Sequence, residues 1–149
     1  MEGIMTTVGT GTYTYTVIED WAKLPPGENF AMVSAVATDS QDRVYVFNRG
    51  EHPIIIFDKE GQFLTAWGEG IFANPHGIFI DRNDHIWCAD NFDHTVRKFT
   101  TSGELLMTLG DTQHPSDTGF KFNESPVCYA AGPFNMVTNA AMGPDGDLF

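Results

Sequence analysis

The sequence predicts an all-β protein in which four-stranded antiparallel sheets form the blades of a partial β-propeller. The first reason is internal repetition, since residues 35–68 lie over residues 77–110 at a constant offset of 42 positions (77 − 35 = 42) without a gap. The second is that each repeat contains four short β-rich segments separated by polar turns. The third is that Ile54, Ile55 and Ile56 put apolar side chains on both faces of one strand, as in a sheet covered on both sides.

Eight strands are expected within the two repeats. They span residues 32–38, 43–48, 53–58 and 62–67 in the first unit, and residues 76–81, 85–90, 95–100 and 104–109 in the second. Gly61 and Gly103 occupy equivalent positions in the last hairpin of each unit, where glycine permits a positive φ. The turn chemistry therefore repeats together with the strands.

The rest of the chain is assigned around these units, within a single incomplete propeller domain over residues 1–149. Residues 13–27, with a strand over 13–21, are expected to form the N-terminal strand of the closing blade. Blade 1 then covers residues 28–68, blade 2 covers 72–110, a long loop covers 111–134, and a third blade begins over 135–149. Closed propellers need about four to eight blades. We therefore expect either that the sequence is a fragment of a longer chain or that copies of it self-associate.

Composition narrows the classes of partner. The chain has 8 Lys and Arg against 20 Asp and Glu, a formal net charge of −12, and no basic cluster that could neutralise phosphates. We expect no nucleic acid and no membrane as partners, because no segment is long and apolar enough to cross a bilayer. No signal peptide is visible, and Cys88 and Cys128 are interpreted as free thiols. These features predict a cytoplasmic location.

Several segments resemble the NHL repeat. They are Pro75-His76-Gly77-Ile78, the strand ending at Asp81, residues 86–91, and then His94, Val96, Phe99 and Gly103. Other segments are similar to the peptidyl-α-hydroxyglycine α-amidating lyases, also called peptidylamidoglycolate lyases, and their bacterial relatives. These segments are residues 33–37 leading to 47–52, residues 74–78, and residues 115–119 followed by 131–135.

This resemblance implies a six-bladed propeller that holds zinc through three histidines at the mouth of its axial channel. Its enzyme splits a peptidyl-α-hydroxyglycine into a peptide amide and glyoxylate. By resemblance, His76 would be a zinc ligand, and Arg49 would be a catalytic cation that steadies the substrate's oxygens. The backbone carbonyls of Val36 and Ile78 would help to hold a structural calcium ion. The partner would be a small-molecule or peptide substrate at the axial rim, and the family's catalytic tyrosine would fall just beyond Phe149.

The repeat itself limits what this chain can do with zinc. The positions equivalent to His76 are Ser34 (76 − 42 = 34) and Thr138 (76 + 62 = 138), so the blades present offer one histidine there. A catalytic zinc needs about three protein ligands. The chain alone is therefore expected to bind zinc weakly or not at all, and to be inactive.

Plainer interpretations stay open at this point. His76 could be a polar residue at the rim, and Arg49 could be a solvated hairpin residue. His52 and His94 recur at equivalent positions, which favours a structural role for both. At the level of the whole protein, the alternative to a lyase is a non-catalytic NHL-repeat propeller that binds a protein or a small ligand.

Overall fold

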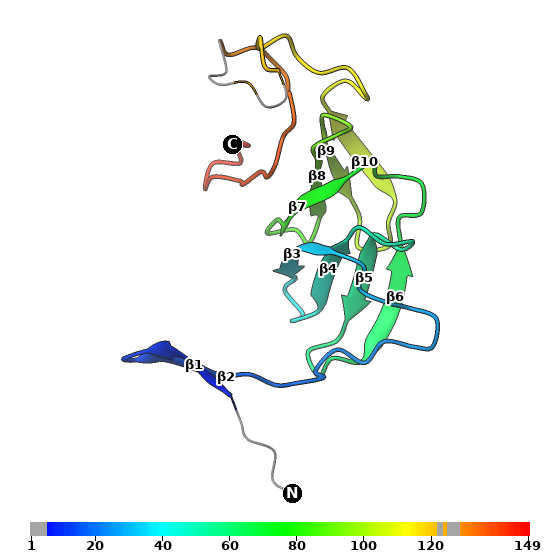
Figure 1. Ribbon diagram of the computed structural model, residues 1–149, viewed down its shortest axis with the longest axis vertical. Helices are drawn as coiled ribbons and strands as arrows, with labels where there is room; N and C mark the ends of the chain where they lie inside the picture. The colour runs from blue at the N-terminus through cyan, green and yellow to red at the C-terminus, as the bar shows by residue number, and fades with distance from the viewer. Residues whose placement is uncertain (1–5, 122–123, 125–128) are drawn as a thin grey trace, which may run out of the picture.

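The structure is a computed structural model that describes residues 6–121, 124 and 129–149. The all-β prediction is confirmed, because the described residues form strands and turns with no helix. Consequently, none of them belongs to an apolar helix of membrane-spanning length. The strands form one two-stranded and two four-stranded antiparallel sheets (Figure 1).

All eight strands predicted from the repeat are present. Sheet 1 contains β3 (Val33–Thr38), β4 (Val44–Asn48), β5 (Ile54–Phe57) and β6 (Phe63–Trp67), and sheet 2 contains β7 (Pro75–Ile80), β8 (Ile86–Asp90), β9 (Thr95–Phe99) and β10 (Leu105–Leu109). In both sheets the spatial order of the strands follows their order in the chain. Each unit is therefore a simple antiparallel meander, as expected for a propeller blade.

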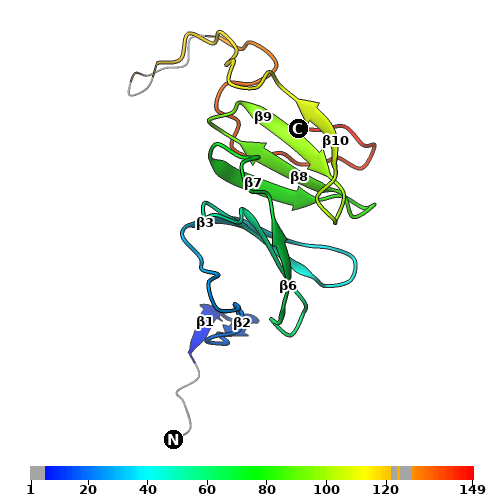
Figure 2. The ribbon, with the colours of Figure 1, turned by 90° about the vertical axis from the view of Figure 1, so that its right-hand side faces the viewer.

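The two sheets stack face to face as consecutive blades. Their shared core contains Tyr45, Phe47, Ile54 and Ile56 from sheet 1, and Ile78, Ile86, Cys88 and Phe99 from sheet 2. The first strands, β3 and β7, lie against each other, so the inner edges of both sheets meet on one side (Figures 1 and 2). The arrangement is a partial propeller whose sheets are not closed into a ring.

The structure describes one of the two cysteines, Cys88. Cys88 is a free thiol in β8 and is fully buried in this core. Burial raises the pKa of the Cys88 thiol well above its usual range, so its role is packing. Cys128 lies outside the described residues.

An aromatic cluster closes the outer part of sheet 2. The ring of Phe99 lies 5.3 Å from that of Trp67 and 5.8 Å from that of Phe72. Trp67 also covers Gly103, where an added Cβ atom would lie 2.9 Å from the indole and where φ is +87°. The predicted need for glycine in this hairpin thus has two causes, the backbone conformation and the indole above it.

The same cluster occurs on sheet 1, with a partner from the N-terminal segment. Phe57 is the equivalent of Phe99, and its ring lies 5.8 Å from Trp21 and 6.0 Å from Phe30. The Trp21 carbonyl lies over Gly61, where an added Cβ would come within 2.0 Å of its oxygen. Trp21 therefore covers sheet 1 as Trp67 covers sheet 2.

The segment before Trp21 differs from the expected strand over residues 13–21. Strand β2 (Tyr13–Thr16) ends earlier and pairs with β1 (Thr7–Thr10) in a hairpin that lies apart from both blades (Figure 2). Both strands are exposed along their whole length. A tight turn at Gly11 lets β1 satisfy the hydrogen bonds of β2 locally. The assignment of residues 13–27 to a closing blade stays a prediction.

The C-terminal residues begin to cover the far face of sheet 2. Val137, Ala140, Met142 and Leu148 pack against a cluster formed by Trp87, Ala89 and Val96. An isolated antiparallel bridge joins Met142 to Leu148. This segment therefore lies on sheet 2 on the side opposite sheet 1.

Candidate functional site

His76 is the second residue of β7, at the inner edge of sheet 2. Its Nδ1 atom lies 2.8 Å from the backbone oxygen of Thr138. Because a carbonyl oxygen only accepts, Nδ1 carries the proton and donates, which leaves the lone pair of the ring on Nε2. A hydrogen bond of this kind orients and tunes a metal-binding histidine. The side chain is thus held in a tautomer suited to ligation through Nε2.

The residue after His76 makes this contact possible. An added Cβ on Gly77 would lie 2.5 Å from the Thr138 oxygen and 2.6 Å from Oδ1 of Asn139. Only glycine lets the third unit approach β7 this closely without a shift. The sequence Pro75-His76-Gly77 therefore fixes both the histidine and its hydrogen-bond acceptor.

Arg49 follows β4 and reaches across to sheet 2. Its Nε donates to the carbonyl oxygen of Pro75 at 2.9 Å, and Nη1 lies 3.2 Å from the sulfur of Met32. Nη2 has no hydrogen-bond partner within residues 6–121, 124 and 129–149. Since Pro75 precedes His76, the structure brings the two predicted site residues to the same edge and leaves part of the guanidinium available.

The loop that leads into β7 is held by a buried carboxylate. Asp90 accepts hydrogen bonds from the backbone N–H groups of Ala73 at 2.6 Å and Asn74 at 2.9 Å. Its charge faces Arg97 at 3.9 Å, which also binds Asp93. In sheet 1 the equivalent residue is Asn48, which accepts from the equivalent backbone amides at 3.0 and 3.1 Å. Both repeats therefore use the same capping arrangement, and in sheet 2 it holds the two residues that precede Pro75.

Val36 and Ile78 occupy equivalent positions in β3 and β7. They pair with Val46 and Cys88, which are also equivalent. The side chain of Ile78 is buried between the sheets, whereas that of Val36 is 60% exposed. Calcium takes six to eight oxygen ligands, so two carbonyls alone do not make its site. Their calcium role stays a prediction.

The described residues contain no group of three or more His, Cys, Asp or Glu side chains that could hold a metal ion. A catalytic zinc needs about three protein ligands, and the single imidazole of His76 supplies one. The residues present therefore do not make a complete zinc centre, and the zinc role of His76 stays a prediction.

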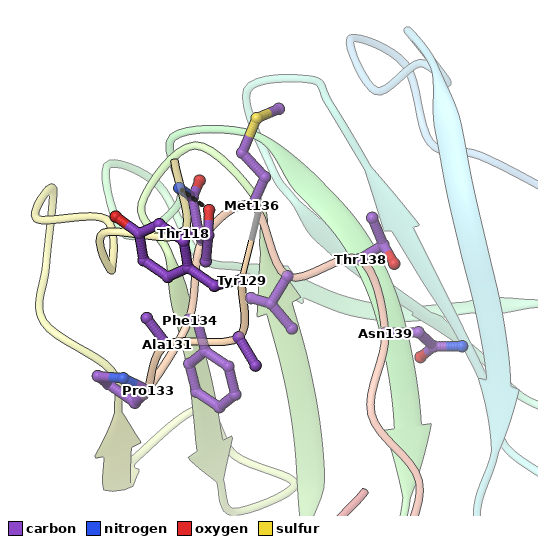
Figure 3. Close-up of a pocket in the computed structure, with 11 residues that line it drawn as sticks. Thr118, Tyr129, Ala131, Pro133, Phe134, Met136, Thr138 and Asn139 are labelled. Carbon is purple, nitrogen blue, oxygen red and sulfur yellow. Dashed lines mark hydrogen bonds between the residues drawn. The ribbon is translucent and has the colours of Figure 1, made fainter. Parts of the chain in front are cut away.

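Two adjoining cavities lie between the loop over residues 111–134 and the third unit. The large cavity, of about 590 Å³, is drawn in Figure 3, and the small cavity measures about 270 Å³. Thr118, Asn135, Met136 and Thr138 line both. Sequence reasoning missed these cavities, because a loop without periodicity gives no signal of what it encloses.

The two recurring histidines hold loops beside the site. His94 accepts from the backbone N–H of Met136 through Nδ1 at 3.0 Å. His52 lies between two carboxylates, with Nδ1 2.9 Å from Glu28 and Nε2 3.0 Å from Glu69. The hydrogen bond to Glu28 raises the pKa of His52 above its ordinary value, with weaker contributions from nearby acidic groups.

This arrangement predicts a pH dependence of stability. A raised folded-state pKa means that the contribution of His52 is fully present below the unfolded value of about 6.5 and is lost as pH rises through the folded value. We expect the free energy of unfolding to fall across this range in the wild type, and to fall less in His52→Gln. Urea denaturation at a series of pH values measures it, with the exposed His114→Gln as the control. Equal pH dependence in all three proteins would contradict the assignment.

Comparison of the sequence with those of known proteins finds several relatives of this chain. NHL repeat-containing protein 3 of Homo sapiens is 35% identical over 107 residues, which cover 64% of this chain and 30% of that protein. Peptidyl-alpha-hydroxyglycine alpha-amidating lyase 2 of Drosophila melanogaster is 29% identical over 133 residues, covering 70% and 32%. A probable amidating lyase of Caenorhabditis elegans is 32% identical over 97 residues, covering 64% and 24%.

The homologues of this chain are therefore NHL repeat-containing proteins and amidating lyases, at modest identity, as the motifs predicted. The chain spans about a third or less of the length of these three relatives. No protein-family model matches it.

Proposed function

We propose that the protein carrying this homology to the amidating lyases is a carbon–nitrogen lyase that cleaves an N-acyl-α-hydroxyglycine into an amide and glyoxylate. The observation that carries the proposal is the meeting of His76 and Arg49 at one edge, through the Pro75 carbonyl. Similarity to amidating lyases from two animals supports it.

The reaction sets the chemical requirements of the site. The C–N bond breaks, the hydroxyl proton leaves as the aldehyde carbonyl of glyoxylate forms, and the amide nitrogen gains a proton. The reaction needs no oxidant and no reductant. Arg49 suits the binding of the substrate's carboxylate, because a guanidinium stays charged and can grip two oxygens at once.

The metals belong to this proposal. His76 would supply one zinc ligand through Nε2, the other ligands would come from other blades, and bound zinc would act as a Lewis acid. The carbonyls of Val36 and Ile78 would contribute to a calcium site where the first strands of adjacent blades meet. The described residues do not complete the zinc centre, and two backbone carbonyls are fewer than the ligands that calcium takes.

The test uses the complete polypeptide that carries this chain, with N-benzoyl-α-hydroxyglycine as the substrate. We expect glyoxylate release, and we expect His76→Ala to lower both activity and zinc content, activity by about 100-fold or more. His85→Ala is the matched control, because His85 lies at the opposite end of the β7–β8 pair and should leave both readouts unchanged.

The alternative is a non-catalytic propeller that binds a protein or ligand, which the similarity to NHL repeat-containing protein 3 favours. Failure of the zinc-loaded wild type to release glyoxylate would support this alternative. Unchanged zinc content in His76→Ala would remove the metal role of that residue.

A further inference from the structure

Met32, just before β3, lies against the guanidinium of Arg49. Its sulfur is 3.2 Å from Nη1 of Arg49. The backbone holds the two residues together, because the N–H of Arg49 donates to the carbonyl oxygen of Met32 at 2.9 Å. The N–H of Met32 in turn donates to Oδ1 of the buried Asn48 at 3.1 Å. The place of the sulfur beside Arg49 is therefore set by the backbone as well as by the side chains.

The side chain of Met32 is open to solvent. It is 57% exposed, more than the other methionines that the structure describes, which are Met107, Met136 and Met142. A thioether sulfur is a weak hydrogen-bond acceptor, so the contact with Nη1 does little to protect it from chemical attack. A soluble oxidant of the peroxide class can therefore reach this sulfur.

Oxidation would change the contact with Arg49. When hydrogen peroxide attacks a methionine, the O–O bond breaks, a sulfur–oxygen bond forms, the sulfur is oxidised by two electrons, and the second oxygen leaves as water. The sulfoxide that forms is polar, and its oxygen accepts hydrogen bonds far better than a thioether does. Because this oxygen is bonded to a sulfur that already lies beside Nη1, it lies within reach of the guanidinium. An N–H that donates to the sulfoxide is not available to a substrate's carboxylate.

We infer that Met32 is a site of reversible oxidation and that its sulfoxide occupies the Arg49 guanidinium. Met32 is then a positioning residue: its thioether leaves Arg49 open to the substrate, and its sulfoxide competes with the substrate. Methionine sulfoxide reductases reverse the modification. The effect on the substrate rests on the proposed function, whereas the contact between the sulfoxide and Arg49 does not.

Mass spectrometry and the ¹H–¹⁵N spectrum of the arginine side chains test the modification and the contact. We treat the complete polypeptide with hydrogen peroxide and expect Met32 to gain oxygen faster than Met107. The Arg49 guanidinium N–H signals should move downfield, and a methionine sulfoxide reductase should return them. Met107→Leu is the matched control and should keep this shift, because Met107 is 45% exposed in β10 at the far edge of sheet 2. Met32→Leu should lose the shift.

The same spectra give the results that overturn the inference. They are slower oxidation of Met32 than of Met107, unchanged Arg49 signals after complete oxidation of Met32, or a shift that persists in Met32→Leu.

Activity measures the consequence for the substrate. With N-benzoyl-α-hydroxyglycine, we expect oxidation to raise KM about tenfold with little change in kcat, because the lost contact serves substrate binding. The reductase should restore KM, and KM of Met32→Leu should not respond to peroxide. An equal KM before and after complete oxidation of Met32 would contradict the effect on the substrate. If the untreated wild type released no glyoxylate, the proposed function would fail, and the mass and the Arg49 signals would still decide the inference.

Discussion

Replacing Phe99 with alanine is expected to lower the free energy of unfolding by about 3–5 kcal/mol. Phe99 is fully buried in the core that the two sheets share. Its ring contacts Trp67 of sheet 1 at 5.3 Å and Phe72 of the connecting loop at 5.8 Å. Alanine would leave a cavity between layers that cannot collapse without moving a whole sheet. Because total stabilities are about 5–15 kcal/mol, this variant would lose a large part of its folded population.

Urea denaturation followed by circular dichroism measures this loss. Phe92→Ala is the matched control, because Phe92 is 53% exposed in the β8–β9 turn and its truncation should cost no more than about 0.5 kcal/mol. The equivalent variant of sheet 1, Phe57→Ala, should resemble Phe99→Ala if Trp21 serves that sheet as Trp67 serves sheet 2. A loss below about 1 kcal/mol in Phe99→Ala would mean that the sheets do not share a core.

The fold was predictable from the sequence because the repeat fixes the phase of every strand. A residue such as Phe99 is recognised as core because Phe57 occurs 42 positions earlier in the same turn-to-strand pattern. Glycine at positions 61 and 103 adds a local requirement that agrees with the pattern. When local turn chemistry and the long-range period agree in this way, strand bounds follow almost to the residue.

The role of Trp21 could not be read from the same period. Trp21 precedes Trp67 by 46 positions (67 − 21 = 46), so an alignment at 42 does not pair them, although their rings cover equivalent phenylalanines. The loop from Trp21 to Phe30 is longer than the loop from Trp67 to Phe72. Packing depends on where a side chain lies in space, and a change in loop length hides that from sequence comparison.

The candidate site was predictable only in part, and for a different reason. His76 and Arg49 came from resemblance, while the contacts that orient them come from backbone carbonyls of Pro75 and Thr138. Every residue has a backbone carbonyl, so the residue types in a sequence do not indicate which carbonyl accepts a hydrogen bond.

Replacing Asp90 with alanine is expected to lower the free energy of unfolding by about 3–5 kcal/mol. The same variant should also disturb the candidate site. Asp90 is fully buried and accepts from the backbone N–H groups of Ala73, Asn74 and Asp93 at 2.6, 2.9 and 3.1 Å. Alanine would leave these donors without an acceptor and would remove one of the two carboxylates that face Arg97. The loop ending at Pro75 would lose its anchor, so the Arg49 contact and the orientation of His76 should weaken with it.

Asparagine separates the hydrogen bonds of Asp90 from its charge. Sheet 1 already uses Asn48 at the equivalent position, with Ile55 where sheet 2 has Arg97. Asp90→Asn should therefore keep the loop in place and cost less than Asp90→Ala, since Arg97 retains Asp93. Urea denaturation gives the stabilities, and the ¹H–¹⁵N spectrum of the His76 ring reports whether Nδ1 still carries its proton. Equal losses in the two variants would show that the charge, and not the capping of the loop, is what the buried carboxylate contributes.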